Sequence, residues 1–499
     1  MNLALQTILH WMLIYIYYIS PSIEGTHLRV WKVCFDAGEV ARDKGRYDQA
    51  ARMFDVAAKL AAPIKDKGVR EATSLNGLAW IYNLQHRNDE GLELAKRALA
   101  IDERRGGAFD SAVSRDLNTL ASIYQNQGKY AAAEPIYRRI VLIKESGGES
   151  ETANFAAILT NLMVVYRSQS KFVEAATVGQ RAIAVYEKAV GPDHIDLANT
   201  LNNLANVYFS QGKYVEAIPL YERSLSIRER KLGAGHPGVA LALHNIANVR
   251  LNQGSYEEAL PKYERAIAIR EKALGPMHVE VASSLNGLGN VLLSQGRYSD
   301  AEPLYQRTLT IFENAKSADQ SSQAMVLGNL SRVALGLEKY EDAESYERRA
   351  MRIREKNPAD ASLVAVCLDA LAEIHYAQGF RSKGDIAFLR ARKLHRQVSR
   401  TGNTRSADPI YERAHDYFRN GQFHEAATMY RRAWNLFEVG MGPDDPHVAQ
   451  AIESYAAALK QLDRNLAAEG FADQAKKLRE RQQPKAPQQE QVVDEESVK

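Results

Sequence analysis

The chain has 499 residues, of which 45% are hydrophobic and 25% are charged, and its formal net charge is only +3. These proportions are ordinary for a globular protein, and the near balance of charge excludes the basic footprint by which proteins hold nucleic acid. The two cysteines, Cys34 and Cys367, are far apart in the sequence. We therefore expect no disulfide framework, and both thiols should be small buried hydrophobes.

Residues 1–22 form an apolar N-terminal segment. Its core, Leu3–Ile19, is apolar and aromatic, but about 17 residues is the short limit for a bilayer span. A secretory signal begins with positively charged residues, but no Lys or Arg precedes this segment. Ser20–Ser22 could still serve as a cleavage site. Four interpretations of this segment remain: a signal peptide, a membrane anchor, a helix docked on the repeats, or an artefactually extended start of the sequence. A membrane contact is expected only through residues 3–19, and the location is either cytoplasmic or, if this segment is a targeting signal, secreted or membrane-anchored.

From Trp31 onward the sequence repeats with a period of 42 residues. The stretch LNNLANVYFSQGKYVEAIPLYERSLSIRERKLG begins at Leu201 and returns at Leu243 as LHNIANVRLNQGSYEEALPKYERAIAIREKALG. A fixed period in this range marks stacked supersecondary units rather than one globular core. A small residue recurs in every unit, at Ala50, Gly91, Ala133, Ala175, Ala217, Ala259, Ala301, Ala343, Gly384, Ala426 and Ala468.

Each unit reads as two helices joined by a turn. In the unit that begins at Leu201, apolar residues recur at helical spacing, stop at Gln211–Tyr214 and resume from Ala217. Ala or Gly is needed where the two helices cross, because a larger side chain there costs about 1–3 kcal/mol. Gly233 and Gly275 should end the second helices. The sequence therefore predicts an all-α solenoid of about eleven helix-turn-helix units, whose core forms only by stacking.

The units divide into two runs. Units one to nine are expected over residues 31–395, and units ten and eleven, with a capping helix, over residues 410–481. Between them, residues 396–409 contain QVSRTGNTRSADP, which lacks an apolar period and is predicted to be a loop or hinge. Residues 482–499 are rich in Gln, Pro and Glu, and we expect a disordered tail.

The order of small and aromatic residues within a unit resembles the tetratricopeptide repeat. The residues that carry this resemblance in unit five are Leu204, Ala205, Tyr208, Gly212, Tyr214, Ala217 and Tyr221. Repeats of that family usually run to about 34 residues, and the longer period here, with GHP at residues 235–237 opening the next unit, is similar to the kinesin light chain subtype. The resemblance covers residues 31–480. It implies a right-handed superhelix whose first helices line a concave, peptide-binding groove.

The resemblance also implies which residues face that groove. They lie three before, two before and one after the small position of each first helix. Across the units, the predicted peptide-binding residues are Asn118, Asn161, Asn202, Asn203, Asn206, Asn245, Asn248, Asn286, Asn290, Asn329 and Arg332. The arginine should add affinity for acidic residues of the bound segment.

Asparagine is a poor helix former, so a row of asparagines on helices calls for a reason. In one interpretation their carboxamides, which donate and accept hydrogen bonds, match the amides of an extended peptide. In the other they bond to neighbouring helices or loop carbonyls. Because Ala is a better helix former, replacing Asn203, Asn206 and Asn248 together with Ala should leave stability equal or higher.

His194, His236 and His278 also recur at the 42-residue period. Equivalent residues of stacked units lie at least one helix-packing distance of about 8–10 Å apart, whereas two imidazoles on one zinc ion lie within about 4 Å. We therefore predict no metal site, and expect these residues to cap or pack at the starts of first helices. The sequence contains no phosphate-binding glycine loop, nucleophile elbow or HExxH pair, so no cofactor and no enzymatic activity are expected.

Together these features predict a non-catalytic protein-protein interaction scaffold or adaptor that binds extended peptide segments of partner proteins. The alternative is a peptide-sensing regulatory protein of signalling or envelope assembly. Because the repeats fill nearly the whole chain, an enzymatic version of the alternative would need an active site grafted on the helices, and the sequence shows none.

Overall fold

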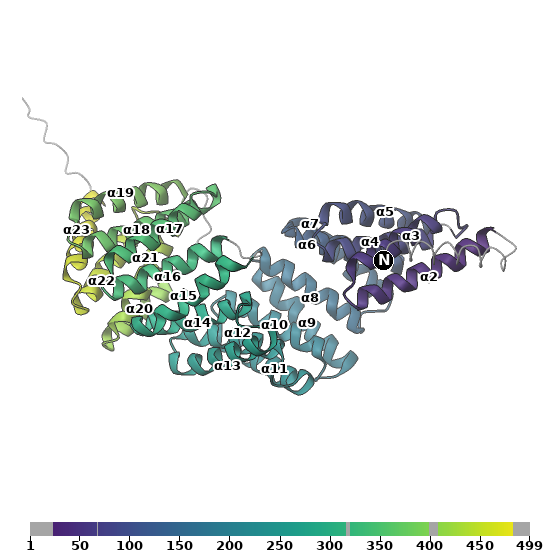
Figure 1. Ribbon diagram of the computed structural model, residues 1–499, viewed down its shortest axis with the longest axis horizontal. Helices are drawn as coiled ribbons and strands as arrows, with labels where there is room; N and C mark the ends of the chain where they lie inside the picture. The colour runs from purple at the N-terminus through teal and green to yellow at the C-terminus, as the bar shows by residue number, and fades with distance from the viewer. Residues whose placement is uncertain (1–22, 67, 316–319, 399–407, 483–499) are drawn as a thin grey trace, which may run out of the picture. The chain divides into compact units, whose positions relative to one another are not determined.

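The computed structural model describes residues 23–66, 68–315, 320–398 and 408–482, and in these residues the chain consists of α-helices and one short 3-10 helix (Figure 1). Twenty-two α-helices follow one another as antiparallel hairpins, which confirms the predicted all-α repeat of eleven units. Among the described residues, no helix is both long and apolar enough to cross a membrane. The apolar segment at residues 3–19 and the tail at residues 483–499 lie outside the described residues.

The helices form two compact units, which comprise residues 1–234 and 235–499 and are called here the N-terminal and C-terminal units. The N-terminal unit contains α2 (Ile23–Asp43), α3 (Tyr47–Ala61), α4 (Val69–Leu84), α5 (Asn88–Gly106), α6 (Ser111–Asn126), α7 (Tyr130–Ser146), α8 (Ala153–Ser168), α9 (Phe172–Val190), α10 (Ile195–Ser210) and α11 (Tyr214–Leu232). The C-terminal unit contains α12 (Pro237–Gln253), α13 (Tyr256–Leu274), α14 (Val279–Ser294), α15 (Tyr298–Asn314), α16 (Gln320–Gly336), α17 (Tyr340–Arg354), η1 (Pro358–Asp360), α18 (Ala361–Ala377), α19 (Arg381–Val398), α20 (Asp408–Arg419), α21 (Phe423–Met441), α22 (Pro446–Gln461) and α23 (Asn465–Gln482).

Even-numbered helices are the first helices of the hairpins, and each packs most closely against the second helix that follows it. The small positions of the second helices are buried, as predicted. A Cβ atom at Gly384 would lie 2.2 Å from the Tyr376 ring, and one at Gly91 would lie 3.0 Å from the Ala79 carbonyl oxygen. The two helices of these hairpins therefore cross too closely for a larger residue.

The predicted helix ends are also confirmed. His194, His236 and His278 are N-caps whose ring nitrogen Nδ1 accepts a hydrogen bond from the backbone N–H two residues later. Gly233 and Gly275 end α11 and α13 with φ angles of 86° and 92°, which only glycine adopts freely. The repeating histidines thus stabilise helix starts, one in each of three successive hairpins.

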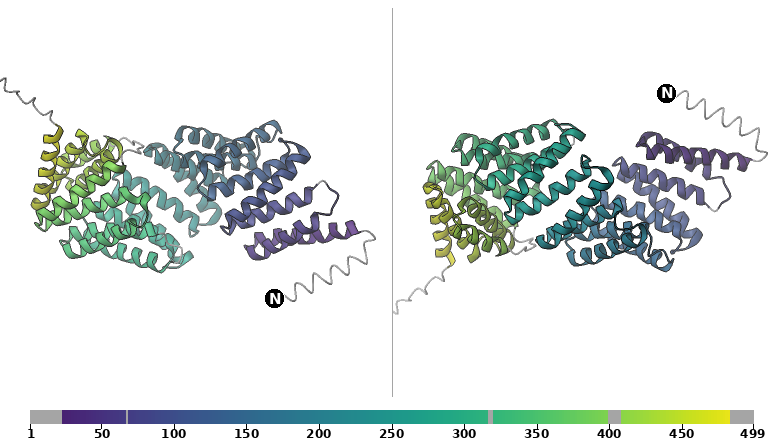
Figure 2. Two further views of the ribbon diagram at one scale, coloured as in Figure 1. Left: turned by 90° about the horizontal axis from the view of Figure 1, so that it is seen from above. Right: turned by 90° about the horizontal axis from the view of Figure 1, so that it is seen from below.

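In the C-terminal unit, the last two hairpins return onto earlier helices of the same unit, and α21 contacts α14 (Figures 1 and 2). The Tyr298 hydroxyl lies 3.1 Å from Nδ1 of His424, and the Arg432 guanidinium donates to Asn252 at 3.3 Å. The helices α20 to α23 therefore share one hydrophobic core with α12 to α19. The predicted hinge at residues 396–409 falls largely on residues 399–407, outside the described residues, and stays a prediction.

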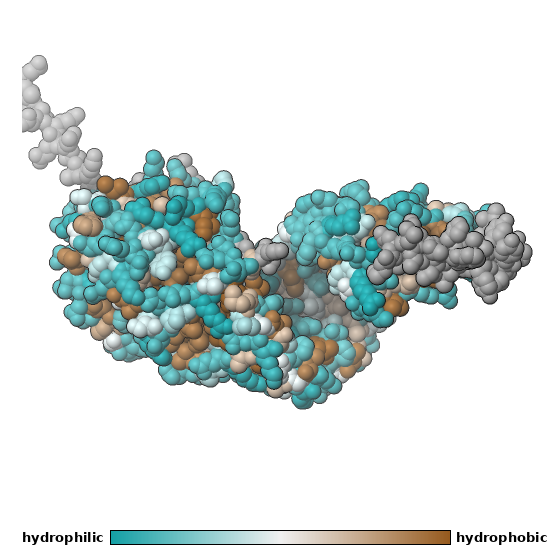
Figure 3. All heavy atoms as spheres, in the orientation of Figure 1, coloured by the Kyte–Doolittle hydropathy of each residue, from teal (hydrophilic) through white to brown (hydrophobic). Residues whose placement is uncertain are grey.

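The surface mixes hydrophilic and hydrophobic residues on the face in view, and brown patches interrupt the teal over the C-terminal unit (Figure 3). Large exposed apolar side chains, such as Val215, Val173 and Ile386, occur singly along the helices. Single exposed hydrophobic residues are normal on globular proteins. The polar residues of the first helices are therefore the stronger candidates for a functional site. Both cysteines, Cys34 and Cys367, are buried and free, as expected.

Candidate peptide-binding site

The predicted site residues all lie on first helices. Asn118 is on α6, Asn161 on α8, Asn202, Asn203 and Asn206 on α10, Asn245 and Asn248 on α12, Asn286 and Asn290 on α14, and Asn329 and Arg332 on α16. All are half-buried except Asn202, which is buried. The first five belong to the N-terminal unit and the other six to the C-terminal unit.

Three of these asparagines hold a buried tyrosine of the second helix in their own hairpin. Each tyrosine hydroxyl donates to the carboxamide oxygen of the asparagine 15 residues earlier. The pairs are Tyr221 with Asn206 at 2.6 Å, Tyr263 with Asn248 at 2.5 Å and Tyr305 with Asn290 at 2.7 Å. Because the tyrosine side chains are almost completely buried, these carboxamides satisfy hydroxyls that would otherwise lack a partner.

A second set of polar bonds joins the first helices of successive hairpins. The residues that bond are 40 to 43 positions apart, about one repeat. The bonds are Asn76 with Asp116 and with Thr119, Thr160 with Thr200, His244 with Ser284, and Asn286 with Asn329. The interpretation of the asparagines as ties between neighbouring helices is therefore correct for part of the row.

In the C-terminal unit the asparagines bond to one another. The Asn329 amide donates to Asn286 at 3.1 Å and to Asn290 at 3.2 Å, and the same Asn290 oxygen accepts from Tyr305. A peptide that bound here would have to replace these internal hydrogen bonds. Much of the carboxamide capacity of α14 and α16 is thus used within the fold.

In the N-terminal unit three predicted asparagines make no side-chain hydrogen bond within the described residues: Asn118, Asn161 and Asn203. The Asn118 oxygen is buried and has no partner at all there. Asn161 and Asn203 lie on α8 and α10, which pack against each other. Because the described part of the chain gives these three side chains no internal partner, they are the residues of the row that remain available to a ligand.

The surroundings of Arg332 differ from those of the asparagines, because they include several charged side chains. Its guanidinium donates to the Thr428 hydroxyl at 3.5 Å, and it pairs with no carboxylate among the described residues. Burial lowers the pKa of Arg332, and the positive charge of Arg431 lowers it further. The neighbours Arg431, Arg464 and Glu373 come from α18, α21 and the α22–α23 turn, and no sequence period predicts that they converge.

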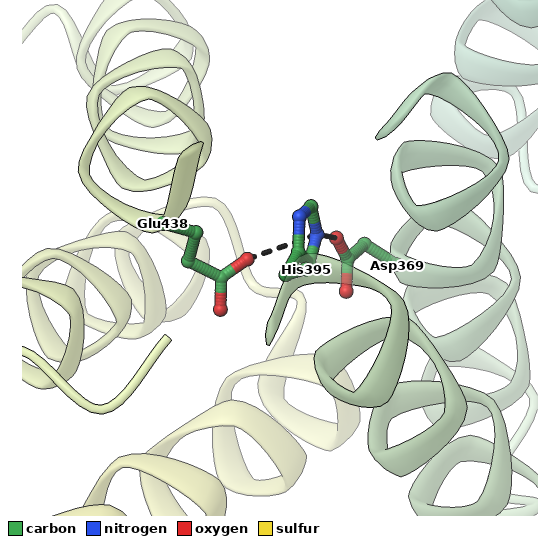
Figure 4. Close-up of side chains that lie close together, drawn as sticks. All are labelled: Asp369, His395 and Glu438. Atoms are coloured by element: carbon green, nitrogen blue, oxygen red, sulfur yellow. Dashed lines mark hydrogen bonds and ion pairs between the residues drawn. The ribbon is translucent and has the colours of Figure 1, made fainter. Parts of the chain in front are cut away.

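One cluster of metal-ligand type lies within the described part of the chain, on α18, α19 and α21 (Figure 4). The Nε2 atom of His395 lies 3.1 Å from an Asp369 oxygen and 3.0 Å from a Glu438 oxygen, and all three side chains are almost fully buried. Arg392 also donates to Glu438, at 2.9 Å. No sequence pattern predicts this cluster, because its members come from three different helices.

The charges in this cluster compensate one another. Burial lowers the pKa of His395, but the hydrogen bonds and charges of Asp369 and Glu438 outweigh it and raise the pKa to about 10. The protonated His395 and the Arg392 guanidinium thus offset the two carboxylates of Asp369 and Glu438. We therefore interpret the four residues as a buried ion network that joins the ninth and tenth hairpins.

Comparison with known proteins identifies the repeats. A model of the tetratricopeptide repeat matches overlapping windows at residues 34–104, 70–146, 114–188, 154–230, 196–272, 238–314 and 280–356, and a second model of that repeat matches residues 400–447. The matched windows cover more than half of the chain. No curated protein matches the chain.

Among solved structures, the apo form of the quorum sensor NprR from B. thuringiensis is similar with a TM-score of 0.52 and 16% identity, over 70% of this chain and 98% of that one. The apo form of RapI gives 0.50 and 14%, over 79% of this chain and 99% of the other. TPR-like repeats from a Podosopora anserina protein described as a kinesin light chain give 0.38 and 23%, over 42% and 99%. At these identities the first two comparisons bear on the fold alone.

Proposed function

The chain belongs to the tetratricopeptide repeat family, and on this premise we propose that it is a non-catalytic scaffold that binds extended peptide segments of partner proteins. The observation that carries the proposal is the set of three carboxamides without internal partners, Asn118, Asn161 and Asn203, on successive first helices of the N-terminal unit. We assign the main peptide contacts to these three residues.

The spacing of the repeats fits an extended peptide. Equivalent first helices of stacked repeats lie at least about 8–10 Å apart, and an extended chain rises about 3.3 Å per residue. One asparagine therefore meets the peptide backbone at about every third residue. A carboxamide that donates to a carbonyl and accepts from an N–H recognises the peptide backbone and not its sequence. The peptide side chains between these points are then free to determine specificity.

The remaining predicted residues play a smaller part in this proposal. Asn206, Asn248 and Asn290 have their oxygens engaged by tyrosine hydroxyls, so less of their hydrogen-bonding capacity is left for a peptide. Asn202, Asn245, Asn286 and Asn329 have other partners within the chain. They position the helices, and peptide contacts there are secondary.

The alternative function, a peptide-sensing regulatory protein, shares the binding step with the scaffold. The two differ in whether the bound peptide changes a second activity of the protein. The fold is similar to that of a quorum sensor over 70% of this chain, which is consistent with the alternative but does not assign an activity to this protein. The scaffold needs only the binding face and is the simpler proposal.

The proposal is tested by screening acetylated and amidated peptides against the full chain and measuring a bound peptide by fluorescence anisotropy. N-methylation of a backbone amide that meets an asparagine should weaken binding about two- to thirteenfold, the equivalent of one net hydrogen bond. Alanine at intervening positions should weaken it less. Binding that tolerates every N-methyl group but depends on side chains would contradict recognition of the backbone by asparagine, and absence of any peptide ligand would contradict the scaffold.

A further inference from the structure

Two cavities lie where the last hairpins of the C-terminal unit meet its earlier helices. The smaller has a volume of about 40 Å³, and its wall includes Arg332, Arg431, Arg464 and Glu373. The larger has a volume of about 400 Å³. They share six wall residues, namely Tyr298, Leu335, Glu373, His424, Leu462 and Arg464. The two cavities therefore adjoin, and we call the smaller one the inner cavity and the larger one the outer cavity.

Positive charge exceeds negative charge on the inner wall. Glu373 forms a close ion pair with Arg431 and a second one, at 3.8 Å, with Arg464. Arg332 has no such partner, and its contact with Thr428 is long. Burial and the charge of Arg464 lower the pKa of His424, so this imidazole is neutral at pH 7. Three guanidinium groups therefore share one carboxylate on the wall.

Other carboxyl groups near the pocket leave this excess in place. Glu338 and Asp463 line only the outer cavity, and both are exposed to solvent. Asp369 and Glu347 act on Arg431 from outside the cavity. Asp369 is paired with His395, and burial raises the pKa of Glu347, which favours its neutral form. Arg332 is half-buried, and its guanidinium shares the single charge of Glu373 with two others. Withdrawing such an excess of positive charge from water costs free energy. This cost is expected of a site that awaits an anion.

We propose that the pocket binds a carboxylate ligand, with the carboxylate beside Arg332 in the inner cavity and an apolar portion in the outer one. About 10–15 Å³ is needed for one water molecule, so the inner cavity has room for about three atoms of that size. This is the size of a carboxylate and is less than that of a phosphate. The planar guanidinium of arginine is also suited to bind a carboxylate through two hydrogen bonds.

The outer cavity suits the rest of such a ligand. Its wall includes apolar and aromatic side chains, namely Leu335, Tyr340, Ala377, Leu462, Leu466 and Ala467. An acidic side chain of a bound peptide, with an apolar neighbour, fits both parts of the pocket, and so does a small organic acid. The peptide as the source of the carboxylate rests on the proposed function, whereas the carboxylate site itself stands without it.

The pocket also lies where the last two hairpins contact earlier helices of the C-terminal unit. The inner cavity exists because Tyr298 bonds to His424 and to Arg464, at 3.1 and 3.4 Å, and because Arg332 reaches Thr428 on α21. A ligand that bridges Arg332 and Arg464 would hold the last two hairpins against α16. Binding should therefore stabilise the folded C-terminal unit, by an amount that grows with the logarithm of ligand concentration once the site is nearly saturated.

The test uses the full chain and titrates glutarate by calorimetry at constant ionic strength, beside neutral glutaramide and inorganic phosphate. Hydrogen exchange of α16 and α21, followed by mass spectrometry, locates the site. We expect glutarate to bind and to slow exchange in both helices, and glutaramide to do neither. The variant Arg332→Gln should lose about tenfold or more in glutarate affinity, and Arg332→Lys should retain more of it than Arg332→Gln.

The control variant is Arg348→Gln, which removes an exposed arginine of α17 that does not line the pocket. It should leave glutarate affinity within about twofold. The proposal is overturned if glutarate fails to bind, if phosphate binds more tightly than glutarate, or if Arg348→Gln weakens binding as much as Arg332→Gln.

The source of the carboxylate is distinguished with a blocked peptide that contains one glutamate between leucines, and with its glutamine counterpart. Tighter binding of the glutamate peptide than of glutarate supports a peptide source. Glutarate that binds while neither peptide does supports the carboxylate site but contradicts the peptide source. Because the asparagine contacts of the N-terminal unit are tested separately, a failure of either idea is distinguishable from a failure of the other.

Discussion

Replacement of Asn206 by alanine separates the structural role of the asparagine row from its proposed binding role. The Tyr221 side chain is 1% exposed, and its hydroxyl donates to Asn206 at 2.6 Å. Without the carboxamide this hydroxyl is buried and unsatisfied, which costs about 1–3 kcal/mol. The better helix propensity of alanine returns about 0.5 kcal/mol. We therefore expect Asn206→Ala to lower the free energy of unfolding by roughly 0.5–2.5 kcal/mol.

The matched control is Asn203→Ala, on the same helix. The Asn203 side chain makes no hydrogen bond within the described residues, so its replacement should raise stability by about 0.5 kcal/mol. The variant Tyr221→Phe removes the hydroxyl itself, and adding it to Asn206→Ala should recover most of the loss, since contacting residues couple in a double-mutant cycle. The assay is denaturation by guanidinium chloride followed by circular dichroism. Equal stability of Asn206→Ala and Asn203→Ala would refute the role assigned to the tyrosine bond.

Three further predictions concern stability. Ala217 is completely buried at a helix crossing, so Ala217→Leu should lower stability by about 1–3 kcal/mol with helix content retained; unchanged thermal melts would refute the register. Burial raises the pKa of Asp116 to about 7, against the opposing effect of Arg115. Because the folded state therefore holds this proton more tightly than the unfolded state, stability of the N-terminal unit should fall by at most about 4 kcal/mol as pH rises from 4 through 7. The variant Asp116→Asn should flatten this pH dependence in denaturation curves. The pKa of His395 is raised to about 10 by Asp369 and Glu438. The contribution of this proton to the free energy of unfolding should be complete below pH 6.5 and lost as pH rises through 10. If melting of the C-terminal unit is insensitive to alkali, or to His395→Gln, the ion network is contradicted.

The repeat itself could be predicted from the sequence because it depends on contacts between neighbouring residues and neighbouring units. The small residue at Ala217 and its equivalents, the histidine caps such as His236, and the glycines that end second helices each reflect local geometry. These features recur every 42 residues and are confirmed by the structure. The same residues recur in each unit because each unit makes the same local contacts.

The polar partners of the asparagines could be predicted only in part. Helix propensity alone predicts greater stability when Asn206 and Asn248 become alanine, and this sign is wrong for both positions if the hydroxyls of Tyr221 and Tyr263 depend on them. The signal was present, because each tyrosine follows its asparagine by 15 residues. The repeat pattern marks Tyr221 as an aromatic position but gives no partner for its hydroxyl.

The pocket of the C-terminal unit could not be predicted from the period at all. Tyr298 meets His424, which is 126 residues later, and Arg464, which is 166 residues later. Such contacts depend on how far the stack of hairpins curves back on itself. That curvature is the sum of many small rotations between units, and no single residue encodes it.

The measurement that tests the central claim most directly is the peptide affinity of the triple variant Asn118→Ala, Asn161→Ala, Asn203→Ala by calorimetry. Each lost hydrogen bond should cost about 0.5–1.5 kcal/mol, so affinity should fall about tenfold to a thousandfold. The control replaces Asn314 and Asn420, which are exposed and lie outside the row, by alanine. Stability of the triple variant should be equal to that of the parent or higher. Affinity that is unchanged in the triple variant would contradict the asparagine face as the peptide-binding site.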